Sequence, residues 1–111
     1  MAVGDRTEKR LGGPTQLGTT TTTIGTVPAA RNWVIKQIII CNTDTTDRTV
    51  TLSIGTAATA ANRIMSALPI GANDIMVFDT ALVLTAAETL QGLSDSASVV
   101  NVTLVGWEKE V

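Results

Sequence analysis

Apolar and polar residues alternate along much of the chain with the period of two that is typical of β-strands. The clearest case is residues 49–55, TVTLSIG, where Val50, Leu52 and Ile54 share one face and hydroxyl side chains occupy the other. A turn-forming sequence, NTDTTDR, precedes this segment. We therefore expect 49–55 to form a β-hairpin with the strand before it, 32–42.

The strand predicted at 32–42, NWVIKQIIICN, has apolar residues on both of its faces. Trp33, Ile35 and Ile39 fall on one parity, which favours a place for Trp33 in the core. A half-exposed strand would alternate more cleanly. This strand is therefore either central with both faces covered, or one of its faces meets a partner.

The closing strand, predicted at 99–108, also separates into two faces. Its core face is expected to hold Val100, Val102 and Leu104, while Val105 and Trp107 lie on the opposite face. In an isolated sandwich that second face would be exposed to solvent. It is either an apolar contact patch for a partner or a surface partly covered by the amino-terminal segment.

Five consecutive threonines, residues 19–23, begin the segment TTTTTIGTV. Threonine is β-branched and is favoured on a pleated surface, so we expect 19–26 to be an edge strand rather than a flexible linker. The strand ends before Pro28, which cannot donate to a ladder.

The rest of the chain continues the strand pattern in short apolar runs between turn residues, apart from 56–63, TAATAANR, which we expect to be a loop. Counting about eight strands at a spacing of roughly 8–12 residues, we predict an all-β fold, an antiparallel β-sandwich or jelly roll.

The first 18 residues hold charges, the sequence GGP and only isolated apolar residues, so they cannot make a core of their own. We expect an extended amino-terminal arm at 1–18, followed by the sandwich domain at 19–111. The arm is expected to dock on a neighbouring subunit, and docking on its own domain is the alternative. The residues predicted at the subunit interface, from the arm and the closing strand, are Arg6, Arg10, Leu11, Leu17, Val105 and Trp107.

Composition excludes several classes of function. The chain has 111 residues, of which only 16% are charged and 44% are hydrophobic, which favours an apolar or hydroxyl-rich surface that a partner covers. Its net charge of -2 and scattered cations do not resemble a nucleic-acid-binding protein. Neither a secretory signal nor a membrane span is encoded, so we expect a soluble protein with no nucleic-acid or membrane partner.

Candidate chemistry is sparse. The sequence has no histidine, which excludes histidine bases and most zinc sites. Its single cysteine, Cys41, is interpreted as a small buried hydrophobe. Asp44 and Asp47 with Asn42 lack the spacing of a calcium loop and are interpreted as turn residues. We predict no catalytic, cofactor-binding or metal-ligating residue, and therefore no enzyme.

Two stretches, VPAARNWVIKQIIICNTDTTDRTVTLSIGTAA at 27–58 and LPIGANDIMVFDTALVLTAAETLQGLSDSASVVNVTLVGWE at 68–108, resemble small virion structural proteins of tailed bacteriophages. The resemblance implies a β-sandwich that assembles on a larger particle, in a virion put together in the cytoplasm of a bacterial host. It brings no catalytic residues with it.

The function expected from these features is that of a capsid decoration or cement protein. Its partners would be copies of itself, as in a trimer, and the major capsid protein or another virion protein. A tail, neck or baseplate component is the first alternative. A carbohydrate- or receptor-binding module is the second, and it is disfavoured because only 3% of the residues are aromatic.

Overall fold

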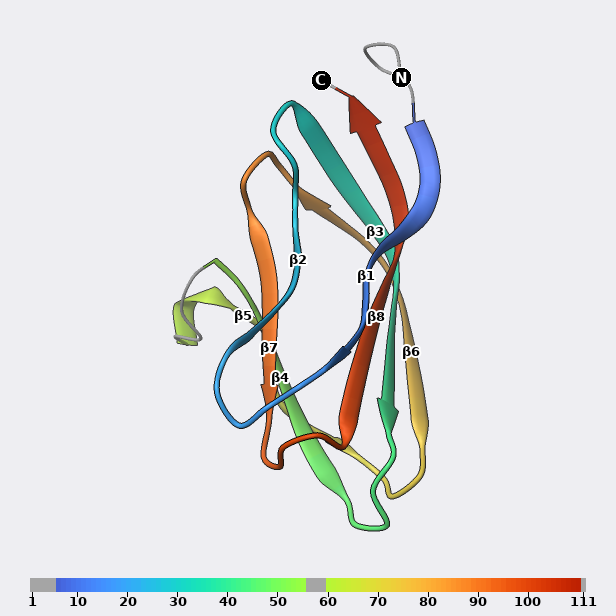
Figure 1. Ribbon diagram of the computed structural model, residues 1–111, viewed down its shortest axis with the longest axis vertical. Helices are drawn as coiled ribbons and strands as arrows, with labels where there is room; N and C mark the ends of the chain where they lie inside the picture. Colours follow the sequence, from blue (N-terminus) through green and yellow to red (C-terminus); the bar gives the residue numbers. More distant parts are fainter. Residues whose placement is uncertain (1–5, 56–59, 111) are drawn as a thin grey trace.

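Figure 1 shows the computed structural model, which describes residues 6–55 and 60–110. Two four-stranded antiparallel sheets pack face to face, with strand orders β1-β8-β3-β6 in sheet A and β2-β7-β4-β5 in sheet B. The all-β sandwich predicted from the sequence is confirmed. The elements are β1 (Arg6–Gln16), β2 (Thr22–Thr26), β3 (Arg31–Asn42), β4 (Arg48–Ile54), a 3-10 turn η1 (Ala60–Asn62), β5 (Arg63–Ile70), β6 (Ile75–Leu84), β7 (Thr89–Ser94) and β8 (Val100–Glu110).

The chain passes from one sheet to the other at most of its turns, and only β4 and β5 are consecutive strands of the same sheet. This connectivity is that of a jelly roll. It corrects the hairpin expected between 32–42 and 49–55, because β3 pairs with β6 and β8 whereas β4 pairs with β5 and β7. Both strands are central in their own sheets, and the turn between them crosses the sandwich.

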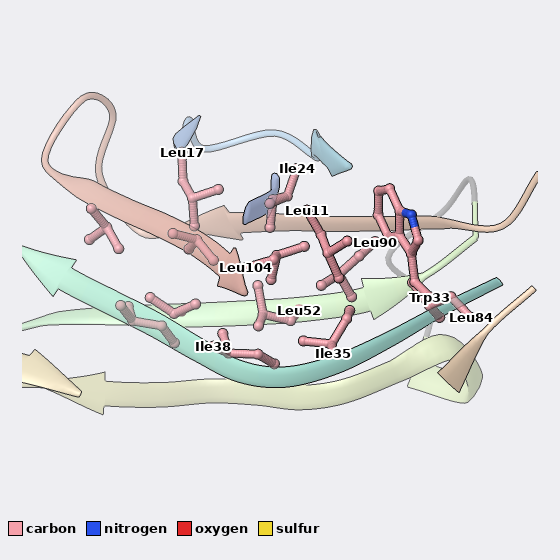
Figure 2. Packing of buried hydrophobic residues seen from close by; sticks show 14 of the residues in the cluster. Leu11, Leu17, Ile24, Trp33, Ile35, Ile38, Leu52, Leu84, Leu90 and Leu104 are labelled. Carbon is pink, nitrogen blue, oxygen red and sulfur yellow. The ribbon is translucent and has the colours of Figure 1, made fainter. Parts of the chain in front are cut away.

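The core lies between the two sheets and receives buried side chains from both (Figure 2). Trp33 is 3% exposed, so its predicted place in the core is confirmed. The core face predicted for the closing strand is confirmed too, since Val100, Val102 and Leu104 are fully buried.

A register shift between Ile35 and Gln37 changes which residues of β3 face the core. Before the shift Ile35 points inward, and after it Ile38 and Ile40 are the buried residues. Ile39 therefore lies on the outer face, not on the same face as Trp33. The simple parity used for the sequence fails at this bulge because an extra residue inverts the alternation.

The expected amino-terminal arm is corrected over residues 6–17. Arg6–Gln16 forms β1 and pairs with β8 of the same chain, and Leu17 N donates to Val100 O at 2.8 Å. Leu11 and Leu17 are 7% and 1% exposed and join the core. The segment docks on its own domain because its two leucines fill core positions and its backbone completes the ladder beside β8. Residues 1–5 lie outside the described residues.

The sequence GGP lets β1 stay close to β8. Gly13 has a φ of 84°, and a Cβ at this position would collide with the carbonyl oxygen of Val102. Glycine is the residue that tolerates both the positive φ and the close approach. Pro14 follows at a point where the β1 register shifts, so its missing N–H fits an irregular edge strand.

The threonine run forms an edge strand, as predicted, although β2 begins at Thr22 rather than at residue 19. Ile24 supplies its buried side chain, and Thr26 Oγ1 lies 3.2 Å from Thr89 Oγ1 on β7. Residues 56–59 of the expected loop lie outside the described residues, and η1 follows them. No helix in the described ranges is long and apolar enough to cross a membrane.

Leu17→Ala tests whether the amino-terminal segment belongs to its own sandwich. Removing a buried leucine should lower the free energy of unfolding by about 2–5 kcal/mol. The exposed neighbour offers a matched control, Thr19→Ala, which should change it by about 0.5 kcal/mol or less. Urea unfolding of the isolated chain measures both. An unchanged stability for Leu17→Ala would show that the segment docks elsewhere.

Candidate assembly surface

The outer face of sheet A carries apolar side chains on three of its strands, on either side of the exposed pair Gln37 and Asp79. Cross-strand partners stand side by side on a sheet face, so the register gives the arrangement directly. Val83, Val34 and Trp107 form one row across β6, β3 and β8, and Val77, Ile39 and Thr103 form another. We call this surface the apolar face; its members are Val34, Ile39, Cys41, Ile75, Val77, Val83, Val105 and Trp107.

Trp107 is the largest side chain on the apolar face and is half-buried. Lys36 Nζ lies 5.5 Å from the centroid of its ring. An ammonium at this distance over an indole is attracted by the negative face of the ring. Lys36 is exposed and comes from the β3 bulge, so the bulge positions a cation beside the aromatic side chain.

The outer side of sheet B carries hydroxyl and amide side chains instead, and those at its centre are buried, since Thr51, Ser53 and Gln91 are 7%, 0% and 3% exposed. Thr51 Oγ1 accepts a hydrogen bond from Ala67 N at 3.0 Å, and Ser53 stands opposite Gln91 on β7. Thr26 and Thr89 continue this polar surface at the β2 edge. Sheet A therefore exposes apolar side chains on its outer side, whereas the central polar side chains on the outer side of sheet B are buried.

A charged network ties three strands together at the end of sheet A where β1 begins and β8 ends. Glu108 is 7% exposed and faces inward. Its Oε2 accepts a hydrogen bond from Trp33 Nε1 at 3.0 Å, and its Oε1 lies 3.4 Å from Lys9 Nζ and 3.7 Å from Arg31 Nε. The indole hydrogen bond, helped by the two cations, holds the pKa of Glu108 below its ordinary value of 4.5 although burial opposes this.

The interface residues predicted from the sequence divide into three groups. Leu11 and Leu17 are buried within the chain, so they are not available to a partner. Arg10 stands opposite Val105, and together with Trp107 these residues lie on the outer side of sheet A. The backbone of Arg6 pairs with Lys109, and its side chain lies outside the described residues.

Sequence reasoning missed the contribution of β6. Ile75, Val77 and Val83 are 56%, 51% and 56% exposed and extend the apolar face to the edge of the sheet. The available signal was that 32–42 has apolar residues on both of its faces, which allowed one of these faces to turn toward a partner. Cys41 is also on this face and is half-buried, which corrects its interpretation as a buried core residue.

The amino-terminal segment does not cover the apolar face. It lies beside β8 as the next strand of the sheet, paired through its backbone. Of the two explanations offered for the apolar outer side of the closing strand, cover by residues 6–16 is therefore excluded.

The aspartates act as turn residues, as predicted. Asn42 Oδ1 accepts from Asp44 N at 3.0 Å, and the Asp44 carboxylate lies 2.7 Å from Arg48 Nη2. Asp47 accepts from Ala72 N, and Asp95 accepts from Thr49 N. In the part of the chain that the structure describes, no three His, Cys, Asp or Glu side chains gather as metal ligands and no pocket is present.

Comparisons with known proteins identify a fold rather than a family. No family model and no curated protein matches the chain. A structure described as Bacillus endospore appendages that form disulfide-linked pili matches with a TM-score of 0.57 and 10% identity, over 99% of this chain and 92% of that one. At this identity the likeness shows a shared fold.

Two further solved structures are less similar. A pentameric capsid protein from metagenomic phage sequences has a TM-score of 0.44 and 17% identity, over 92% of this chain and 60% of that one. An exo-β-1,3-galactanase of Phanerochaete chrysosporium has a TM-score of 0.42 and 19% identity, over 94% of this chain and 29% of that one.

Glu108→Gln tests the charged network. A carboxylate with a lowered pKa stabilises the fold above its ordinary value of 4.5, and this stability is lost as the pH falls through the folded-state pKa. The variant should be about 1–3 kcal/mol less stable at pH 7, because a neutral amide replaces the charged acceptor. The difference between wild type and variant should shrink as the pH falls below about 4.5.

Urea unfolding at pH 7, 5, 4 and 3 measures both proteins. Asp44 and Glu88 also have lowered pKa values, through Arg48 and Thr85, but they are present in both chains and cancel in the difference. A difference that stays constant with pH would contradict a stabilising charge on Glu108.

Proposed function

We propose that the chain is a non-enzymatic structural protein of a bacteriophage virion. In this proposal it decorates the capsid, and its apolar face binds the major capsid protein of the shell. The observation that carries the proposal is the apolar face itself, on which Ile75, Val77 and Val83 are exposed and Trp107 is half-buried.

The chemistry of the apolar face suits a protein partner. Interface cores are enriched in aromatic residues and depleted of charge, and their rims are polar. Trp107 and its neighbours Val34 and Val105 provide such a centre, with Lys36 and Arg10 at the side. A tryptophan in this setting is a good candidate for the residue on which most of the affinity depends.

Three further observations support a particle as the partner. The stretches at 27–58 and 68–108 resemble virion structural proteins of tailed bacteriophages. The fold also occurs in the Bacillus endospore appendage structure, which belongs to an assembling fibre. Only 16% of the residues in the whole chain are charged, and this low fraction favours a protein that works in an assembly.

A tail, neck or baseplate component is the alternative location. Electron microscopy of the native particle distinguishes the two, because decoration places copies on the icosahedral shell and the alternative places them along the tail or at its ends. A carbohydrate-binding module needs exposed rings, whereas Trp33 is buried and Phe78 is half-buried against the core. Trp107 remains as the aromatic residue of the outer faces.

Trp107→Ala and Trp33→Ala form a pair that tests the proposal. Trp107→Ala should weaken binding to purified particles by about 2 kcal/mol or more and leave the melting temperature of the isolated chain nearly unchanged. Trp33→Ala should instead lower the free energy of unfolding by about 3–5 kcal/mol, because it empties a core position. Co-sedimentation with particles and thermal melts provide the two readouts.

The opposite pattern, in which Trp107→Ala melts early and binds normally, would contradict the assignment of the apolar face to the shell. Lys36→Ala is a useful companion variant. It removes the cation beside the ring but retains the apolar surface, so it should weaken binding less than Trp107→Ala.

A further inference from the structure

The exposed apolar side chains of the chain gather at two edge strands. The large hydrophobic residues that are exposed in the described ranges are Ile64 on β5 and Ile75, Val77 and Val83 on β6. These strands are the edges of sheets B and A that lie farthest from β2 and β1. Scattered exposed apolar residues are ordinary, but three of these four residues share one edge strand, β6.

Unpaired edges attract further strands, and proteins normally protect them with proline, bulges, short length or charge. Three of the four edges carry such features. β1 contains Pro14 and two register shifts, and β2 is only five residues long. β5 contains Pro69, two register shifts and Ala67 at a φ of 48°.

β6 has much less protection. It is ten residues long, IMVFDTALVL, and contains no proline, glycine or lysine. Asp79 is its only charged residue, and Gln37 Nε2 donates to Asp79 Oδ1 at 3.1 Å, which directs the carboxylate toward β3 and away from the open edge. The one irregularity is a shift in the pairing with β3 between Asp79 and Leu82.

We propose that β6 is the site at which a second copy of this chain binds, by antiparallel pairing of β6 with β6 about a two-fold axis at Thr80. In this register the numbers of any two opposite residues add up to 160. Val77 then faces Val83 of the second copy, Phe78 faces Leu82 and Asp79 faces Ala81. The pairing would extend sheet A across both copies.

The sequence of β6 matches this register better than its neighbours. An axis at Asp79 would place two carboxylates directly opposite each other, which is unfavourable. An axis at Phe78 would place Val77 opposite Asp79, and an axis at Ala81 would place Val83 opposite Asp79. The axis at Thr80 pairs Val77 with Val83 and Phe78 with Leu82, and it places Asp79 opposite the small residue Ala81 rather than opposite a second carboxylate or a valine.

The irregularity of β6 is compatible with this arrangement. It spans Asp79 to Leu82 and therefore falls at the axis. On either side, the regular part of one copy that precedes Asp79 meets the regular part of the other copy that begins at Leu82. Met76 and Phe78 are partly buried against the core, and the second copy would cover the part of them that is still exposed. Both backbone ladders and apolar contacts would thus contribute.

This inference concerns the open backbone edge of β6, and it does not depend on the docking of the apolar face on a shell although Val77 and Val83 belong to both surfaces. The test uses the isolated full-length chain without particles, so a failure of particle binding leaves it untouched. Sedimentation equilibrium over a range of concentrations should give a dimer of twice the chain mass of 11.6 kDa.

Val77→Lys should raise the dissociation constant of the dimer by at least about tenfold, because two lysines enter an apolar contact. Val77 is 51% exposed, so the melting temperature of the monomer should change little. The matched control is Ile64→Lys on β5, an exposed apolar residue of the other edge, which should leave dimerisation unchanged.

The register is tested by the double variant Val77→Lys with Val83→Glu. Each lysine would face a glutamate of the second copy, so dimerisation should return to within about threefold of wild type. A monomer at all concentrations, a larger ring or fibre, or equal dissociation by Ile64→Lys would overturn the proposed β6 dimer. Failure of the double variant to recover would overturn the axis at Thr80.

Discussion

Pairing of β8 with β1 on one side and β3 on the other is the contact on which the rest of this structure depends. β8 supplies Val100, Val102 and Leu104 to the core, and its two neighbours come from the beginning and the first half of the chain. The fold is therefore complete only when the end of the chain has returned between its earlier strands. Glu108 strengthens this closure, because it joins Trp33 on β3 to Lys9 on β1.

The sequence predicted the strands well because each strand alternates locally. Residues 49–55 and 99–108 show the period of two, and the corresponding strands β4 and β8 bury the residues expected of them. The pairing partners were not predictable in the same way. The turn between β3 and β4 looks like a hairpin turn in sequence, but it crosses between sheets, since partner choice depends on which ladder each strand completes.

The amino-terminal segment is a second case in which the local sequence did not predict the packing partner. Residues 6–17 have the composition of an arm, with charges, glycines and isolated leucines. Composition does not reveal that Leu11 and Leu17 fill positions in the core of their own sandwich. The candidate surface was found in part. Trp107 and Val105 were identified from parity, whereas the contribution of β6 depends on its place beside β3 and on the bulge that turns Ile39 outward.

The two proposals concern adjacent surfaces, and their geometry makes them reinforce each other. A two-fold axis perpendicular to sheet A keeps the outer faces of both copies on the same side, so a β6 dimer would present two apolar faces to one shell. Two linked contacts bind more tightly than one because the second becomes intramolecular after the first. The unprotected edge of β6 and the apolar face next to it would then act together. Dimerisation through β6 would strengthen the weak contact that a single small sandwich makes with the particle.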